Sequence, residues 1–138
     1  MKNRMLAVAI AGVLWVAAAG LAGAKDVAVS LTGEQEVPAV ESKAKGMGKI
    51  TIADDGSVSG SVKTTGIAGV AAHIHEAPAG KNGPPVITLE KKGDSEWAVP
   101  AGAKLTDAQL ASFKAGNLYV NVHSAEHKGG EIRTQLKP

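Results

Sequence analysis

Four histidines, placed as two close pairs, are the residues of this sequence best suited to chemistry. His73 and His75 flank a single isoleucine, and His127 follows His123 by four positions. Side chains two positions apart on a β-strand point to the same face, so His73 and His75 can stand side by side. Imidazole binds copper, zinc, nickel and iron, ions that usually take three or four protein ligands. If the fold joins the pairs, the sequence predicts a metal site made of three or all four of these histidines.

Other interpretations of these residues stay open. A His-x-His pair on a strand also occurs on a solvated face, and a loop histidine can cap its loop through a hydrogen bond. Glu76 and Glu131 could add a carboxylate ligand or an acceptor behind an imidazole. Arg133, two positions after Glu131, is adequately explained as one half of a surface ion pair.

The composition excludes several classes of site. The chain of 138 residues contains no cysteine, which excludes disulfide scaffolds, thiolate zinc sites, iron–sulfur clusters and thiol nucleophiles. Aromatic residues make up only 3%, so aliphatic side chains must form most of the core. No G-x-S-x-G motif accompanies the histidines. We identify no catalytic residue, and the sequence favours a binding role over an enzymatic one.

The first 24 residues are typical of a secretory signal peptide. Lys2 and Arg4 give a basic start, an uncharged run covers residues 6–22, and the sequence Ala-Gly-Ala at 22–24 provides the small residues of a cleavage site. We therefore expect a periplasmic or secreted protein that is cleaved after Ala24. An uncleaved membrane anchor is the alternative, because the run is just long enough to span a bilayer.

The charge of the mature chain argues against nucleic acid as a partner. The whole sequence has a formal net charge of +2. Without Lys2 and Arg4, 13 basic residues remain against 13 acidic ones, so the basic excess belongs to the signal peptide. No second hydrophobic run follows, which predicts no membrane span after cleavage. A metal ion and a protein of the cell envelope remain as candidate partners.

Short alternating runs dominate residues 25–138, which we expect to form one domain. Residues 27–31, 49–53 and 57–65 alternate between apolar and polar or small side chains, and the last two runs flank a hairpin signal, Asp55-Gly56. Residues 118–123 and 131–136 predict two further strands. Thr106 and Gln109 form a capping box, which predicts one helix over 106–115. The expected fold is an all-β, antiparallel, Greek-key-like β-sandwich with one short helix.

Five segments together resemble the CHRD domain family. They are 31–38 (LTGEQEVP), 72–75 (AHIH), 82–84 (NGP), 118–124 (LYVNVHS) and 129–133 (GGEIR). The resemblance covers nearly all of residues 25–138 in the right order and implies an extracytoplasmic β-sandwich. The family pattern matches His73, His75 and His123, whereas His127 lies where we expect the family to vary.

Residues 72–76 (AHIHE) are also similar to the copper-ligand strand of copper–zinc superoxide dismutase, itself a β-sandwich. The sequence lacks that enzyme's cysteine pair, an evident zinc loop and an active-site arginine in the expected loop, which argues against dismutase activity. We therefore expect a small exported β-sandwich that binds copper or zinc. The alternatives are a non-metal adhesion or protein-interaction module of the cell envelope and, less favoured, a dismutase-like redox enzyme.

Overall fold

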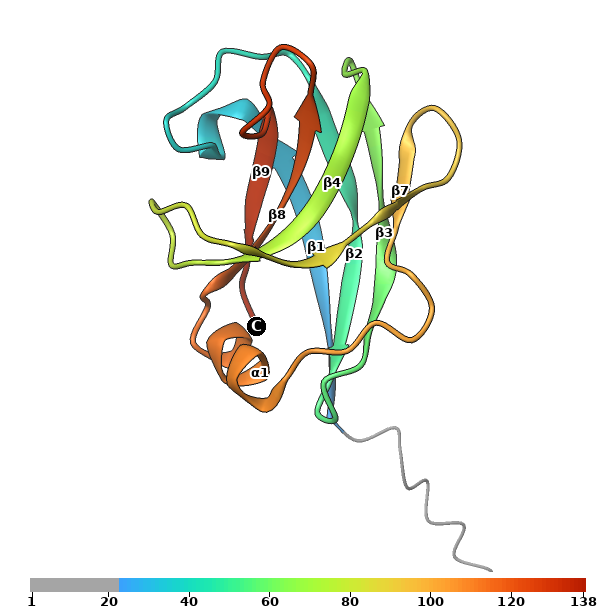
Figure 1. Cartoon of the computed structure of the whole chain (residues 1–138), viewed down its shortest axis with the longest axis vertical. Helices are drawn as coiled ribbons and strands as arrows, with labels where there is room; N and C mark the ends of the chain where they lie inside the picture. Colours follow the sequence, from blue (N-terminus) through green and yellow to red (C-terminus); the bar gives the residue numbers. More distant parts are fainter. Residues whose placement is uncertain (1–22) are drawn as a thin grey trace, which may run out of the picture.

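The computed structural model describes residues 23–138 as one curled antiparallel sheet with a single α-helix (Figure 1). The elements are β1 (Ala24–Thr32), the 3-10 helix η1 (Gly33–Gln35), β2 (Lys45–Ala53), β3 (Val58–Thr65), β4 (Gly69–Glu76), β5 (Pro85–Thr88), β6 (Glu90–Lys91), β7 (Glu96–Ala98), α1 (Asp107–Lys114), β8 (Leu118–Ser124) and β9 (Ile132–Leu136). The expected all-β class with one short helix is confirmed. The predicted signal peptide lies outside the described residues, apart from its last two.

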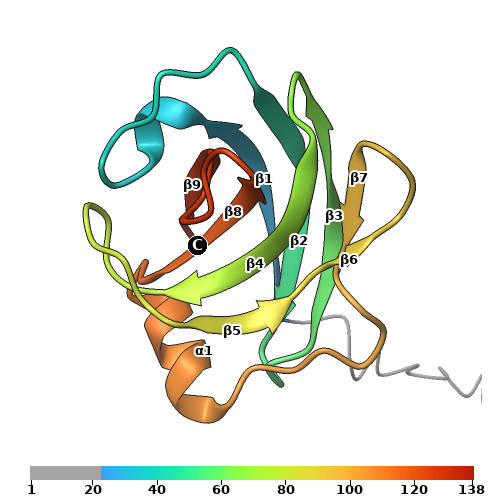
Figure 2. The ribbon, with the colours of Figure 1, turned by 45° about the horizontal axis from the view of Figure 1, so that its top comes forward.

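The sheet curls until it nearly closes. Its strand order is β5-β4-β8-β9-β1-β2-β3-β7-β6. β5 and β6 are separated only by Leu89, whose N–H donates to the carbonyl of Ala72 in β4 at 2.9 Å, so this segment joins the two ends of the sheet (Figure 2). On the other side, β1 and β9 pair only at Thr32 and Arg133. Two halves of one sheet therefore face each other in the manner of a sandwich.

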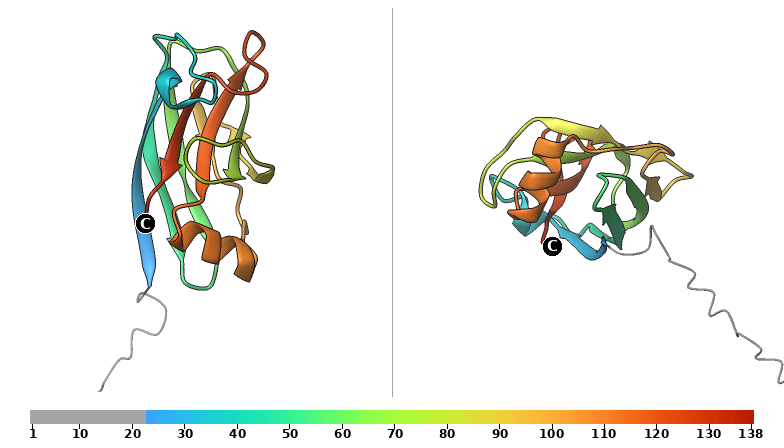
Figure 3. Two further views of the ribbon diagram at one scale, coloured as in Figure 1. Left: turned by 90° about the vertical axis from the view of Figure 1, so that its left-hand side faces the viewer. Right: turned by 90° about the horizontal axis from the view of Figure 1, so that it is seen from below.

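The core lies between these halves and is mainly aliphatic, as the composition predicts. Its fully covered side chains include Leu31, Ile50, Ile52, Val62, Ile74, Leu118, Val120, Val122, Ile132 and Leu136. α1 lies at one end of the sheet and adds Phe113, which is 2% exposed (Figure 3). Residues on the opposite face of each strand are thus free to carry polar side chains.

Local signals in the sequence are found where they were expected. The β2–β3 hairpin turns at Asp55-Gly56, and Gly56 has a φ of +90°, a conformation that glycine adopts without strain. The Thr106 hydroxyl accepts from the Gln109 N–H, and the Gln109 side chain accepts from the Thr106 N–H, so the capping box at the start of α1 is confirmed. Within residues 23–138, no helix has the length and apolar character needed to cross a membrane.

Candidate metal centre

β4 and β8 bring the two histidine motifs together. In their antiparallel register, His75 lies opposite Tyr119, and Ala71 lies opposite His123. Residues paired across neighbouring strands share a face of the sheet, and the core-facing side chains of β4 and β8 occupy the intervening positions. His73, His75 and His123 therefore all stand on the face directed away from the core.

Three loops cover this outer face: residues 33–44, 77–84 and 125–131. The Asn82 side-chain amide donates to the carbonyl of Val37 at 2.7 Å, which ties the first loop to the second. Residues of all three loops line one pocket together with Tyr119 and His123 of β8. His75 and His123 are consequently only 8% exposed, while His73 is half-buried. The loops thus cover most of this polar face.

The three imidazoles are close enough to share one ion. His73 Nδ1 and His123 Nε2 are 3.0 Å apart, and one nitrogen from each of His73, His75 and His123 lies within 4.8 Å of the others. Two imidazole nitrogens bound to one ion at about 2.0–2.1 Å stand about 2.8–3.4 Å apart when the angle at the ion lies between 90° and the tetrahedral value. The 3.0 Å separation already falls in this range.

Backbone carbonyls fix which ring nitrogen of two histidines carries the proton. His75 Nδ1 is 2.9 Å from the Gly83 carbonyl, and His123 Nδ1 is 2.8 Å from the Lys128 carbonyl. A carbonyl only accepts, so both Nδ1 atoms donate, and the Nε2 of each neutral ring carries a lone pair that can accept a hydrogen bond or bind a metal. His75 Nε2 is buried without a hydrogen-bond partner in the described part of the chain. This arrangement is typical of metal-ligating histidines, whose second nitrogen is held by an acceptor.

The side chains of Tyr119 and Arg133 form a stack against the imidazole of His75. The Tyr119 ring lies parallel to the imidazole, with centroids 4.8 Å apart, and the Arg133 Cζ lies 3.4 Å from the Tyr119 centroid. Arg133 is 2% exposed and donates to Asn82 Oδ1 at 2.9 Å and to the Lys81 carbonyl at 2.6 Å. The surface ion pair predicted for Arg133 and Glu131 is therefore wrong. Arg133 is a buried anchor between β9 and the 77–84 loop.

Burial favours the neutral form of His73 and His75. Loss of water around the ring lowers the pKa of His73, and the nearby His123 and His75 lower it further. Burial also lowers the pKa of His75, against the opposing effect of the Gly83 carbonyl. Neutral imidazole is the form that binds a metal, so the site is prepared for binding at neutral pH.

Glu36 is a residue of this site that the sequence analysis missed. It is 5% exposed, and burial raises the pKa of its carboxyl to about 7, against the opposing effects of the Arg133 guanidinium and the Asn121 amide. Together with His75, His123 and His127, it lines an open pocket of about 540 Å³. Its only signal in the sequence was its place in the first segment of the family resemblance.

His127 and the two predicted carboxylates stand apart from the three imidazoles. His127 lines the same pocket but groups with Glu126 and Glu131 instead. The Glu131 carboxylate accepts from the hydroxyls of Ser42 at 2.8 Å and Ser124 at 2.7 Å, so its oxygens already tie the loops to β8. Glu76, at the end of β4, belongs to neither group of ligand atoms.

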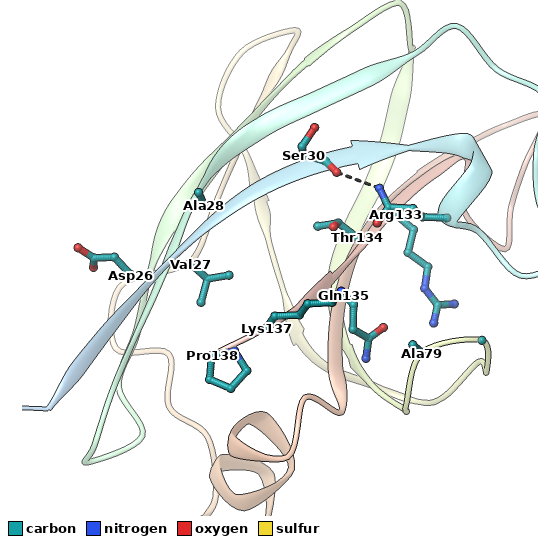
Figure 4. Close-up of a pocket in the computed structure, with 12 residues that line it drawn as sticks. Asp26, Val27, Ala28, Ser30, Ala79, Arg133, Thr134, Gln135, Lys137 and Pro138 are labelled. Atoms are coloured by element: carbon teal, nitrogen blue, oxygen red, sulfur yellow. Dashed lines mark hydrogen bonds between the residues drawn. The ribbon is translucent and has the colours of Figure 1, made fainter.

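A larger pocket, of about 790 Å³, opens at the weak joint between β1 and β9 (Figure 4). Asp26, Ser30 and Gln135 are among the residues that line it, and the Gln35 side chain donates to the Ser30 carbonyl at 3.0 Å. Its described lining contains no histidine. Of these two pockets, the smaller one is therefore the one lined by the histidines that the sequence analysis identified.

The comparison with known families covers almost the whole described structure. The CHRD domain model matches residues 27–136, from within β1 to the end of β9, including all three imidazoles of the centre. No curated protein and no solved structure matches the chain. A match of this extent confirms the resemblance seen in the sequence segments, and the chain belongs to the CHRD domain family.

Proposed function

We propose that this chain is an exported metal-binding CHRD domain that holds one copper or zinc ion with His73, His75 and His123. The observation that carries the proposal is the 3.0 Å separation of His73 Nδ1 and His123 Nε2 at a site where His75 Nε2 has no partner among residues 23–138. In the metal-free protein, His73 Nδ1–H donates to His123 Nε2. An ion between them takes both lone pairs once His73 carries its proton on Nε2.

The ligand set favours copper first and zinc second. Three imidazoles without a thiolate are suited to both ions, and Cu(II) binds nitrogen ligands more tightly than Zn(II) does. His127 lies in the neighbouring group of ligand atoms, so we expect it to contribute weakly from the pocket wall.

Equilibrium dialysis of the purified domain against copper and zinc, followed by elemental analysis, tests the site. The wild-type protein should take up one equivalent. The double variant H73A/H75A should lose this uptake, and the matched variant H127A should weaken it by no more than about threefold, equivalent to about 0.7 kcal/mol. One equivalent bound with unchanged affinity by H73A/H75A would place the site elsewhere. The non-metal interaction module would then be the better proposal.

The cellular location is a separate proposal with its own test. The basic start, the apolar run and the Ala-Gly-Ala sequence support export and cleavage after Ala24. Cleavage there removes a single residue from β1, which begins at Ala24. Mass spectrometry of the natively expressed protein should find Lys25 at the amino terminus. Membrane-bound protein that keeps Met1 would instead support an anchor.

A further inference from the structure

A pocket lies beside the three imidazoles. His75 and His123 both line it, together with Glu36, Tyr119 and Gly130. An ion bound by three histidines keeps at least one coordination position for another ligand. Since two of the three ligand side chains form part of the pocket wall, we expect that position to face the pocket.

Two buried side chains beside Gly130, which lines the pocket, each have an oxygen atom without a hydrogen-bond donor within the described structure. Glu36 Oε2 and Asn121 Oδ1 are buried without a hydrogen-bond partner among residues 23–138, and their residues are 5% and 1% exposed. Unsatisfied buried acceptors are costly, and native proteins retain few of them without a ligand, a water or a functional reason. A bound molecule with hydrogen-bond donors would satisfy both atoms.

Gly130 lets the side chains of Glu36 and Asn121 pack directly against the backbone at this position. A Cβ atom at this position would collide with Glu36 Oε2 and with the Asn121 side-chain nitrogen, and the Gly130 φ of +122° also disfavours any other residue. Glu36 and Asn121 thus converge over a glycine backbone beside the pocket.

We propose that the metal centre reserves one coordination position for a small protic ligand, such as water or a neutral nitrogen base, which donates hydrogen bonds to Glu36 and Asn121. The inference rests on the proposed metal site. The charge of a bound ion favours the carboxylate form of Glu36. A carboxylate at this place accepts a hydrogen bond from a donor on the ligand. Arg133 offsets only part of its charge, so the carboxylate disfavours an anion and the pocket selects neutral protic ligands over anionic ones.

Titration of the copper-loaded protein with azide, followed by its visible absorption, tests the selectivity. The variant E36Q removes the negative charge and adds a donor, so azide should bind about tenfold more tightly than to the wild type. The matched control E34Q makes the same chemical change at an exposed position of η1 and should leave azide binding within about twofold.

The wild-type protein offers a second measurement that needs no variant. Relative to a copper complex of a free tris-imidazole chelator, it should favour added imidazole over azide by about tenfold. Equal azide affinities in E36Q and wild type, with copper still bound, would overturn the inference and leave the metal site intact. A large loss of copper affinity in E36Q would also overturn it, because Glu36 would then be a ligand of the ion itself. Failure of the wild type to bind copper would overturn the proposed function.

Discussion

His73 and His123 lie 50 positions apart in the chain, yet His73 Nδ1 and His123 Nε2 are 3.0 Å apart across the β4–β8 pair. The Lys128 carbonyl holds His123 Nδ1, so the His123 ring is already oriented before any ion arrives. A site whose ligands are held in place by the sheet and by backbone carbonyls loses little conformational entropy when it binds.

Metal binding should stabilise the folded domain. An ion that binds only the folded state contributes about 2.7 kcal/mol when its free concentration is a hundred times Kd. Urea unfolding with copper present should therefore shift to higher urea, and a chelator should reverse the shift. H73A/H75A serves as the control and should unfold at the same urea concentration with and without copper. An equal shift in this variant would show that copper acts outside the centre.

The copper affinity should decrease as the pH is lowered, but the decrease should begin at a lower pH than it would for exposed imidazoles. Burial lowers the pKa of both His73 and His75 below the ordinary 6.5. Protons therefore compete with the metal for His73 and His75 only at a pH below 6.5. The same sign applies to the metal-free fold: between the two pKa values the unfolded chain binds more protons, so this contribution to stability is lost as pH falls. Affinities measured across the acidic range should decline below 6.5, and a decline centred above it would contradict the burial.

Glu36 should give the metal-free protein an opposite pH dependence. Its pKa is raised from 4.5 to about 7, mainly by burial, so the folded state binds the extra proton between these values. The contribution is complete below pH 4.5 and is lost as pH rises through about 7, amounting to about 3 kcal/mol. E36Q, which stays neutral, should lack this loss. Unfolding free energies of both proteins, compared across the range, isolate the effect from the histidines. Parallel curves would show that Glu36 stays ionised in the fold.

Two adjacent glycines should respond differently to the same substitution. Gly130 has a φ of +122° and no room for a Cβ beside Glu36 and Asn121, whereas nothing lies within 4 Å of a Cβ built on Gly129. G130A should therefore destabilise the domain by about 2–3 kcal/mol, and G129A by less than about 1 kcal/mol. Chemical denaturation of the two variants checks this. Equal losses would mean that the turn, and not the crowded pocket floor, requires glycine.

The sequence predicted that His73 and His75 share a face, because side chains two positions apart on a strand point the same way. It also predicted the hairpin at Asp55-Gly56 and the helix after Thr106, since both depend on neighbouring residues. It did not show which strands are neighbours. The β4–β8 register follows from long-range packing, and the family resemblance supplied the only reason to expect it.

Arg133 and Glu36 illustrate what sequence reasoning missed. A lone arginine two positions from a glutamate on a strand is typically exposed, and Glu36 lies in a segment without periodicity. Their burial depends on loops that fold over the outer face of β8 and β9, a tertiary feature. The sequence therefore gave no indication that Arg133 and Glu36, two charged residues of the candidate site, are buried.

Arg133 provides a direct test of this buried layer. Its planar guanidinium stacks on Tyr119 and reaches both Asn82 Oδ1 and the Lys81 carbonyl. Lysine keeps the charge but has neither the flat face nor the forked donors, so R133K should cost about 2–3 kcal/mol of unfolding free energy. The control K49R, on the exposed face of β2, should change it by less than about 0.5 kcal/mol.

R133K should also lower the affinity of the site for copper. Tyr119 lies between Arg133 and His75, and its hydroxyl accepts from the Gly83 N–H at 3.1 Å, next to the carbonyl that orients His75. If R133K loosens this stack and loop, His75 is held less firmly, and copper affinity should fall about tenfold, as expected for loss of a group behind a ligand. Dialysis at one pH, with K49R as reference, measures this. A destabilised R133K with unchanged copper affinity would show that the stack supports the fold alone and that the Gly83 carbonyl suffices to orient the imidazole.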